Sequence, residues 1–297
     1  MFLTKASAGR SDYYINKFKY AARIIKANQD VRGGVMKFMK AVILCGGRGT
    51  RLRDETEFKP KPLIEIGGMP ILWHIMKIYS HYGVKDFVLC LGYKGQMIKD
   101  FFLNLDMYQA DVTFNTKTKN VKYHSNKKPD EWNITFAETG LDTGTGGRIK
   151  KIEKYIGEDS FFLTYGDGVS DVDISKLHMF HKKHGKTATV TAVTPLAKFG
   201  VLQLQSGMVV DFTKRDIVHG SRIDGGYFVF KKQIFDYLTM DNGCMLEDKP
   251  LKMLAKDKLF VAYMHNGFWQ CMDIQQQVDM LNELWQKNQA PWKVWKS

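Results

Sequence analysis

A glycine-rich turn directly after a short apolar run is the feature that most constrains how this chain can fold. Ala41–Cys45 consists of apolar residues that favour β structure, so we predict a buried strand. Gly46, Gly47 and Gly49 follow at once. Three glycines in four residues allow left-handed backbone conformations and let another molecule approach the amide groups closely. Such a turn after a buried strand is a common way of holding a phosphate.

Basic residues surround this turn. Arg51 can grip a phosphate through two parallel hydrogen bonds. Lys59 and Lys61 lie next to prolines, which stiffen the backbone around them. The pattern is not that of a P-loop, and it lacks the third glycine of the dinucleotide fingerprint at Leu52. The stretch predicts a polyanion-binding loop of another kind; the alternative is a tight strand–helix turn with a solvated basic face.

The composition favours a soluble α/β protein with small anionic substrates. The chain has 297 residues, 44% of them apolar, and a formal charge of +13, which suits one large α/β domain or two small ones. No motif that reads DNA or RNA is present, no run of about 18 apolar residues predicts a spanning helix, and no apolar signal core is visible. Four cysteines without metal-ligand spacing indicate a reducing, cytoplasmic location.

Residues 1–38 form a basic N-terminal extension, with eight basic and two acidic side chains and hence a net charge of +6. Residues 11–27 have the apolar spacing of an amphipathic helix, which could lie on a membrane surface or dock on a partner. Two simpler interpretations stay open: a helix that packs on its own domain, or translation that starts further along, at Met36 or Met39.

After the turn, helical and strand patterns alternate as expected for a parallel sheet. Pro70–His81 predicts a helix, Asp86–Leu91 a strand and Gly95–Leu105 a second helix. Strand–helix–strand units of this kind build a parallel sheet with helices on its faces. Residues 108–136 alternate polar and apolar side chains, so we expect edge strands there, with a polar excursion at residues 126–130.

A second glycine-rich turn and a carboxylate follow. Thr143–Arg148 precedes an expected helix, Ile149–Tyr155, and Ser160–Tyr165 predicts a buried strand. Asp167 lies just beyond that strand, between two glycines. A carboxylate at the carboxyl end of a buried strand sits where open α/β sheets bind ligands, so Asp167 is a candidate metal ligand. The alternative is an Asp that caps the next turn.

Strands and helices continue to the end of the chain. A strand entered over two glycines begins at Asp224, and Asp273 supplies a second carboxylate. Trp292 and Trp295 in the tail are candidates for contact with a neighbouring subunit. We expect strands at 188–194, 201–204, 208–212, 224–230 and 260–264, and helices at 231–240, 246–256 and 274–285.

Several motifs in a fixed order resemble the sugar-1-phosphate nucleotidyltransferase family, and most closely the glucose-1-phosphate cytidylyltransferases. The likeness runs from Met39 to about Trp295. The resemblance implies a catalytic domain over residues 39–297 with a Rossmann-like, mostly parallel mixed sheet flanked by helices, as in glycosyltransferase-A folds. The motifs are Gly46–Leu52 with Lys59–Pro62, Lys61–Gly68, Ile71–Ile75, Gly92–Gly95, Thr145–Arg148, Tyr165–Gly168 and Gly267–Gln270.

The resemblance also implies roles for individual residues. Arg51 would hold the leaving pyrophosphate and Lys61 would reach the transferring phosphate, as catalytic residues. Asp167 and Asp273 would bind Mg²⁺, the expected cofactor. Gly147 and Arg148 are the candidates near the cytosine base. The nucleotide-binding set is Leu44, Gly46, Gly47, Gly49, Thr50, Gly146, Gly147 and Arg148.

The acceptor side departs from the family pattern. Where the family has Phe-x-Glu-Lys-Pro, this chain has Phe212-Thr213-Lys214-Arg215-Asp216, so a sugar-facing glutamate is absent. An ammonium cannot accept a hydrogen bond from a sugar hydroxyl. The family's Asn before Gly-Gly is Asp224 here, and a second Glu is Lys249. Candidate acceptor-binding residues are Lys214, Arg215, Asp224, Gly225 and Glu247.

Three functional hypotheses therefore follow. The first is CMP transfer from CTP to glucose 1-phosphate or a related sugar phosphate by a homo-oligomeric cytoplasmic enzyme, with release of pyrophosphate and a CDP-linked product. The second is cytidylyl transfer to a non-sugar phosphate with its own carboxylate, such as L-glutamine phosphate. The third is a non-catalytic nucleotide-binding protein that has lost its acceptor site. Neither nucleic acid nor a membrane span is expected.

Overall fold

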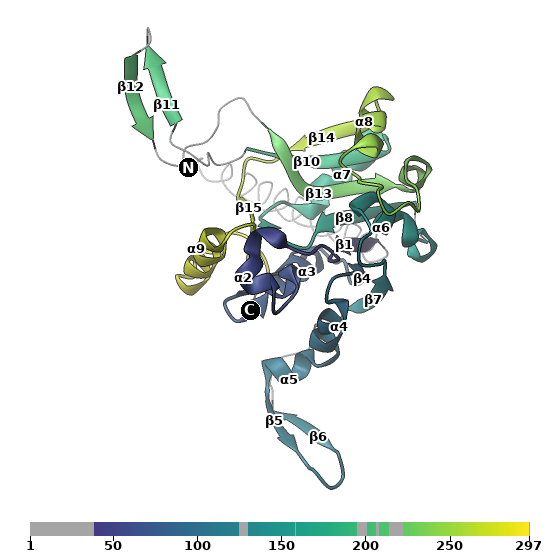
Figure 1. Cartoon of the computed structure of the whole chain (residues 1–297), viewed down its shortest axis with the longest axis vertical. Helices are drawn as coiled ribbons and strands as arrows, with labels where there is room; N and C mark the ends of the chain where they lie inside the picture. Colours follow the sequence, from purple (N-terminus) through teal and green to yellow (C-terminus); the bar gives the residue numbers. More distant parts are fainter. Residues whose placement is uncertain are drawn as a thin grey trace, which may run out of the picture.

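A seven-stranded sheet forms the centre of the computed structural model (Figure 1). The structure describes residues 39–124, 130–157, 159–194, 201–205, 208–213 and 222–296. Among the described strands of this sheet, only the one over Ile223–Lys231 runs antiparallel to its neighbours. In spatial order the strands are β14 (Phe260–Met264), β10 (Ala188–Val193), β13 (Ile223–Lys231), β8 (Ser160–Tyr165), β1 (Lys40–Leu44), β4 (Asp86–Leu91) and β7 (Asn133–Glu138).

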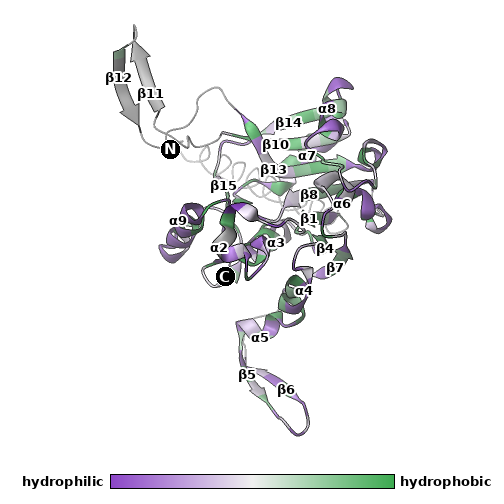
Figure 2. Cartoon of the chain, in the orientation of Figure 1, coloured by the Kyte–Doolittle hydropathy of each residue, from purple (hydrophilic) through white to green (hydrophobic). Residues whose placement is uncertain are grey.

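Helices cover both faces of the sheet because the strands are apolar on both sides. On β1, Ala41 and Ile43 join one buried cluster, while Val42 and Leu44 join the other. This alternation is the period of two that a strand imposes on its side chains. Figure 2 shows hydrophobic residues concentrated in the strands. The first cluster includes α3 (Ile71–His81), α4 (Gly95–Leu103), α7 (Ile174–His184) and α9 (Gln275–Gln286); the second includes α6 (Thr145–Lys151), η4 (Lys232–Tyr237) and α8 (Lys249–Lys256).

Smaller elements complete the described fold. Two hairpins, β5–β6 and β11–β12, project from the body in Figure 1. Further short helices and strands connect the larger elements. The bounds are η1 (Thr50–Leu52), α2 (Arg53–Thr56), η2 (Lys61–Leu63), β2 (Glu65–Ile66), β3 (Met69–Pro70), α5 (Leu105–Gln109), β5 (Asp111–Phe114), β6 (Val121–His124), η3 (Glu153–Tyr155), β9 (Gly168–Ser170), β11 (Val201–Gln205), β12 (Met208–Thr213) and β15 (Trp269–Cys271).

The predicted α/β class with a mostly parallel sheet is confirmed, and most strand predictions agree to within one or two residues. Residues 108–136 differ: β5 and β6 pair with each other, and only β7 joins the main sheet, at its edge. The predicted 246–256 helix begins later, at Lys249, where Pro250 in the first turn suits a helix start. The predicted 231–240 helix is a shorter 3₁₀ helix, η4.

The second glycine-rich turn was expected to precede its helix, but it forms the first turn of α6. Gly146 and Gly147 allow close packing there. A Cβ at Gly146 would lie 2.7 Å from Cys244 Sγ, and a Cβ at Gly147 would lie 2.7 Å from the Asp241 carbonyl oxygen. The absence of side chains therefore lets the helix start against the 241–244 segment.

The C-terminal segment packs on its own chain, so the expectation that Trp292 contacts a neighbouring subunit is wrong. Trp292 is fully buried and stacks on Phe268, with ring centroids 5.5 Å apart. Its Nε1–H donates to His74 Nδ1 at 3.4 Å, and His74 is buried in α3. Burial lowers the pKa of His74 to about 4, which keeps the ring neutral.

Within the described ranges, no helix has both the length and the apolar composition that crossing a bilayer requires. The predicted N-terminal extension, residues 1–38, lies outside the described residues.

Candidate active site

The predicted phosphate loop leaves the carboxyl end of β1, in the middle of the sheet. The Cys45 N–H donates to the Cys90 carbonyl at 3.0 Å, and the Gly166 N–H donates to the Leu44 carbonyl at 3.1 Å. These bonds bring the loops after β1, β4 and β8 to one edge of the sheet. Ligands of open α/β sheets bind at this edge.

The side chain of Arg148 packs against the glycine-rich loop after β1 and fixes its shape. Its guanidinium is buried and donates to the carbonyl oxygens of Leu91, Gly140, Leu141 and Gly46, at 2.6 to 3.1 Å. A Cβ at Gly46 would lie only 2.2 Å from Arg148 Nη1, so this position requires glycine. The sequence placed Arg148 near the base, whereas the structure engages its donors in holding three loops together.

A cavity of about 480 Å³ lies above this loop. Leu44, Gly46, Gly47 and Gly49 line it, as does Arg148, so these predicted nucleotide-binding residues come together. Thr50 lines a smaller neighbouring cavity beside Arg48. Gly146 and Gly147 do not line either cavity. They allow α6 to pack closely on the 241–244 segment, and this packing positions Thr145, which lines the larger cavity.

Arg48 and Asp142 also line the larger cavity. Arg48 Nη2 forms an ion pair with Asp142 Oδ1 at 2.8 Å, and both side chains are exposed. The pair therefore joins the first glycine-rich loop to the segment before α6.

The two predicted metal ligands meet, although they lie far apart in the sequence. Strand β15 pairs with β9, in register Cys271 to Gly168, and the Met272 N–H donates to the Asp167 carbonyl at 2.8 Å. This pairing brings Asp273 beside Asp167, and the Lys61 ammonium contacts both carboxylates. The Asp273 N–H donates to Gln277 Oε1 at 2.6 Å, which fixes the backbone just before α9.

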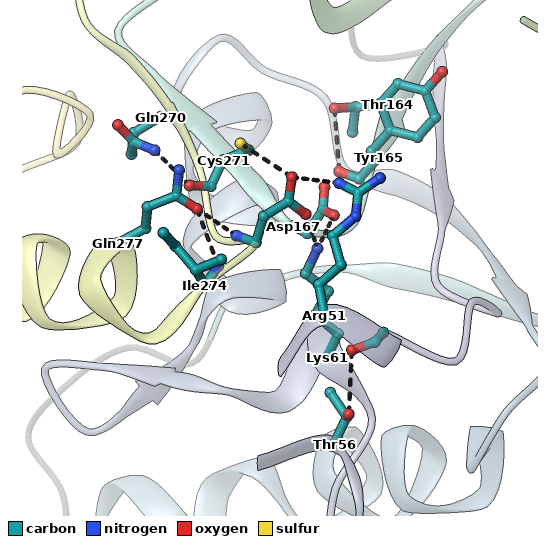
Figure 3. A network of polar contacts seen from close by, with 12 residues as sticks. Arg51, Thr56, Lys61, Thr164, Tyr165, Asp167, Gln270, Cys271, Ile274 and Gln277 are labelled. Atoms are coloured by element: carbon teal, nitrogen blue, oxygen red, sulfur yellow. Dashed lines mark hydrogen bonds and ion pairs between the residues drawn. The ribbon is translucent and has the colours of Figure 1, made fainter. Parts of the chain in front are cut away.

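Both predicted catalytic cations contact these carboxylates, and Figure 3 shows Arg51 and Lys61 beside Asp167. Lys61 Nζ lies 2.6 Å from Asp167 Oδ2 and 2.6 Å from Asp273 Oδ1. Arg51 Nη1 lies 2.8 Å from Asp273 Oδ2. The four charges thus form one cluster at the junction of two cavities.

The contacts within the cluster hold Lys61 and Asp273 in their charged forms. Burial raises the pKa of Asp273, but the hydrogen bonds and charges of Lys61 and Arg51 outweigh this effect and lower it overall. Burial lowers the pKa of Lys61, but Asp167 and Asp273 outweigh it and raise the pKa. The lysine is therefore a fixed cation, and Asp273 is a fixed anion.

This donor set suits Mg²⁺. The two carboxylates already enclose a cation, the Lys61 ammonium, which shows that their oxygens converge on a shared position. Within the described part of the chain, no cluster of three or more His, Cys, Asp or Glu side chains could hold a metal. Mg²⁺ is commonly bound by only one or two carboxylates together with substrate phosphates, so two are sufficient.

A second cavity, of about 340 Å³, adjoins the first on the β13 side. It is lined by Arg51, Asp167 and Asp273, and by the Asp224–Gly226 entrance to β13. Asp224 Oδ1 accepts the Gly226 N–H at 2.6 Å, and Trp269 Nε1–H donates to the Gly225 carbonyl at 2.6 Å. The predicted acceptor residues Asp224 and Gly225 therefore face the predicted metal ligands.

The other predicted acceptor residues are placed differently. Lys214 and Arg215 lie outside the described residues. Glu247 does not line either cavity; its carboxylate binds the Tyr165 and Thr145 hydroxyls. Sequence reasoning missed Tyr165, Trp269 and Gln277 as site residues. Tyr165 and Trp269 stand within the quoted Tyr165–Gly168 and Gly267–Gln270 motifs, which could have pointed to them, whereas Gln277 carries no such signal.

Comparisons with known proteins agree with this geometry. The family model described as nucleotidyl transferase matches residues 40–285. The chain is 47% identical over 258 residues to a glucose-1-phosphate cytidylyltransferase of Salmonella typhi, covering 86% of this chain and all of the relative. It is 46% identical over 257 residues to a probable glucose-1-phosphate cytidylyltransferase of Bacillus subtilis, with the same coverage.

Solved structures share the fold. A putative glucose-1-phosphate thymidylyltransferase from Bacillus anthracis, in complex with sucrose, matches with a TM-score of 0.61 at 16% identity. The match covers 87% of this chain and 98% of that one. The family model spans the loop after β1, the carboxylate pair and the acceptor-side cavity, and the two curated relatives match along their whole length. The chain therefore belongs to the nucleotidyl transferase family.

Proposed function

We propose that this chain is a cytidylyltransferase that transfers CMP from CTP to glucose 1-phosphate, with release of pyrophosphate. The observation that carries the proposal is the cluster of Lys61, Arg51, Asp167 and Asp273 at the junction of two cavities. The 46–47% identity to curated glucose-1-phosphate cytidylyltransferases, over their whole length, supports both the nucleotide and the acceptor.

The larger cavity would take the nucleotide. The loop after β1 offers backbone amides and a close approach at Gly47, where a Cβ would meet nothing within 4 Å. Arg51 and Lys61 add positive charge on the side where the triphosphate would end. The base would then lie toward the segment around Leu141 and Thr145, which lines the far side of the cavity.

The chemistry requires positioning and charge stabilisation rather than a strong base. The acceptor phosphate is already a competent nucleophile, so no side chain has to deprotonate it. Lys61 and Arg51 would stabilise the negative charge that develops as pyrophosphate leaves. Asp167 and Asp273 would hold Mg²⁺, which when bound neutralises charge on the α-phosphate and aligns the attacking oxygen.

The acceptor-side cavity favours a polyhydroxylated substrate. Its described lining presents hydrogen-bond acceptors, namely the carboxylates of Asp224, Asp167 and Asp273, together with the cation Arg51, which is paired with Asp273. Sugar hydroxyls can donate to such groups, and a phosphate can pair with Arg51. An acceptor with its own carboxylate would meet like charge at Asp224, so we place L-glutamine phosphate second.

The four cysteines are free thiols, and two of them, Cys45 and Cys90, are buried. Free thiols persist in reducing compartments. This supports a cytoplasmic location for the proposed enzyme.

Pyrophosphate release tests the proposal directly. The full chain is incubated with Mg²⁺ and each of CTP, UTP, GTP and dTTP, together with glucose 1-phosphate, mannose 1-phosphate or L-glutamine phosphate. We expect the highest kcat/KM with CTP and glucose 1-phosphate. Faster turnover with L-glutamine phosphate would replace the acceptor assignment. Tight CTP binding without release in any combination would favour a non-catalytic nucleotide-binding protein.

A further inference from the structure

Tyr165, at the carboxyl end of β8, lines both cavities. The nucleotide-side and acceptor-side linings have two residues in common, Tyr165 and Asp167. Asp167 belongs to the charged cluster already described. Tyr165 is a neutral group at the boundary, and the mechanism above assigns it no role.

The Tyr165 ring also lies directly against the acceptor strand. A Cβ at Gly226 would lie 2.7 Å from Tyr165 Cδ2, so the glycine allows the ring to touch the backbone at the start of β13. Gly226 has a φ of +75°, a conformation that other residues rarely adopt. Its N–H is bound by Asp224 Oδ1. A change in the position of this ring would therefore move the Asp224–Gly226 segment.

Glu247 ties Tyr165 to the nucleotide-side loop. The Tyr165 hydroxyl donates to Glu247 Oε1 at 2.6 Å, and the Thr145 hydroxyl donates to Glu247 Oε2 at 2.6 Å. The Thr145 oxygen in turn accepts the Leu246 N–H at 2.8 Å. Both carboxylate oxygens are thus engaged by hydroxyls from the two sides of the site. Burial raises the pKa of Tyr165, and the charges of Asp224 and Glu247 raise it further, so the hydroxyl remains a donor.

These contacts form a continuous path across the site. It runs from Thr145 in the nucleotide-side lining, through Glu247 and Tyr165, to Gly226 in the acceptor-side lining. Glu247 is exposed, and its two charge-assisted hydrogen bonds are the contacts that join Thr145 to Tyr165. A ligand that orders the loop at Thr145 would therefore also order the acceptor wall.

We infer that Tyr165 and Glu247 are positioning residues that couple nucleotide binding to acceptor binding. The inference rests on the proposed function and deepens it, because it concerns the same two substrates. Glu247 acts through Tyr165 and Thr145 rather than by touching the acceptor. Occupation of the larger cavity by CTP would then raise the affinity of the smaller cavity for the sugar phosphate, and by thermodynamic reciprocity the reverse.

The test measures this coupling without turnover. Binding of α,β-methylene CTP, whose bridging carbon prevents transfer, is followed by calorimetry with Mg²⁺, in the presence and absence of saturating glucose 1-phosphate. We expect the acceptor to tighten analogue binding about fivefold or more in the unmodified chain. In Tyr165→Phe the ring stays and the hydroxyl is lost, so this ratio should fall to within about twofold of one, while affinity for the analogue alone is nearly unchanged.

Graded variants separate coupling from simple damage to the fold. Glu247→Ala should lose the coupling completely, and Glu247→Gln, which keeps one carbonyl oxygen, should retain part of it. Tyr165→Phe added to Glu247→Ala should have no further effect, because the path is already broken. In steady-state assays with the other substrate saturating, the same variants should raise the KM for glucose 1-phosphate and the KM for CTP by similar factors, because the coupling is reciprocal.

Tyr237→Phe is the matched control. Tyr237 also donates to a carboxylate, Asp257 Oδ2 at 2.9 Å, but it lies outside both cavity linings. Its loss should leave the coupling ratio and the kinetics unchanged. Unchanged coupling in Tyr165→Phe, equal loss in Tyr237→Phe, or no coupling in the unmodified chain would each overturn the inference. Absence of turnover in the unmodified chain would instead refute the proposed function.

Discussion

Lys61 contacts both carboxylates of the candidate site. Its ammonium bridges Asp167 and Asp273, and Arg51 compensates Asp273 from the other side. Two carboxylates at such a short separation would repel each other strongly without these cations. The chain therefore supplies its own counter-charges to the two predicted metal ligands.

Asp167→Asn should separate catalysis from folding. Asparagine keeps the size of the side chain but loses the charge that faces Lys61, so kcat should fall by about two to three orders of magnitude. Lys61 keeps Asp273 as a partner, so the melting temperature should change by only a few degrees. Pyrophosphate release and thermal unfolding by circular dichroism measure the two effects.

Asp86→Asn provides the control for that variant. Asp86 is at the amino end of β4, where it accepts from Asn133 Nδ2 at 3.1 Å, away from the site. It should keep normal turnover. Pyrophosphate release near the normal rate in Asp167→Asn would show that Asp167 is not required.

Acceptor binding should depend on pH through Asp224. Burial raises the pKa of this carboxyl to about 6; the Gly226 N–H opposes the shift and the charge of Glu247 adds to it. Above pH 6 the ionised carboxylate accepts hydrogen bonds from hydroxyls, and below it the protonated form accepts them less well. The KM for glucose 1-phosphate should therefore rise as pH falls from about 7 to 5.

Asp224→Asn has no ionisable group at this position, so its acceptor KM should rise less than that of the unmodified chain over the same pH range, and the part that remains reflects the acceptor phosphate, whose second pKa is about 6. The KM for CTP serves as the internal reference in both proteins. An identical pH profile in Asp224→Asn and the unmodified chain would assign the effect to another group.

At the scale of elements, α6 and the loop after β1 behave as one unit because Arg148 joins them. The guanidinium donates to four carbonyls on three segments, and two of these carbonyls, those of Leu91 and Gly46, also accept backbone N–H groups. Burial lowers the pKa of Arg148, although the group remains charged. Arg148 therefore stabilises the shape of the loop and does not change its charge in the physiological pH range.

Arg148→Met should lower the free energy of unfolding by about 2–4 kcal/mol, because three loops lose the hydrogen bonds that the buried Arg148 guanidinium donates to them. Urea denaturation of the ligand-free protein measures this loss. Arg48→Met is the control: it removes an exposed ion pair with Asp142, so the change should stay below about 1 kcal/mol. Equal losses in the two variants would contradict the structural role of Arg148.

The strands of this sheet were predictable because their signal is local. Runs such as Ser160–Tyr165 and Asp86–Leu91 are apolar over their own length, and the structure forms strands over the same residues. The start of α6 was not predictable, because it depends on the distant 241–244 segment that packs on Gly146 and Gly147. The same limit applies to Arg148, whose partners come from three loops.

In the site, the convergence of Asp167 and Asp273 was expected from the family resemblance, and the β9–β15 pairing produces it. The sequence could not show that Lys61 would bridge the two carboxylates, nor that Glu247 would bind hydroxyls from two elements. Such contacts depend on side-chain directions that no periodicity encodes. The prediction for Lys214 and Arg215 lies outside the described residues, and it stays a prediction.

At the scale of the whole molecule, the C-terminal segment packs back onto the body of the domain. It places Trp292 between Phe268 and the His74 region of α3, so residues near both ends of the domain share one aromatic cluster. Asp273 and α9 lie between Phe268 and Trp292 in the chain. The tail therefore braces the part of the chain that carries the second carboxylate.

Trp292→Ala should cost about 3–5 kcal/mol of unfolding free energy, as expected when a fully buried large aromatic side chain is removed. Trp295→Ala should cost less, because Trp295 is only partly buried. Chemical denaturation of both variants measures the difference. An equal or smaller loss in Trp292→Ala would mean that the tail packs loosely in solution.

The single reversed strand has a consequence for how this enzyme could diversify. Because β13 runs against its neighbours, its first residues, rather than its last, reach the edge where β1 and β8 end. One wall of the proposed acceptor cavity is thus encoded by a strand entrance, independently of the loops that would bind the triphosphate. Exchanging a few residues before Tyr227 between relatives should retarget the enzyme to a new sugar while its nucleotide preference is inherited intact.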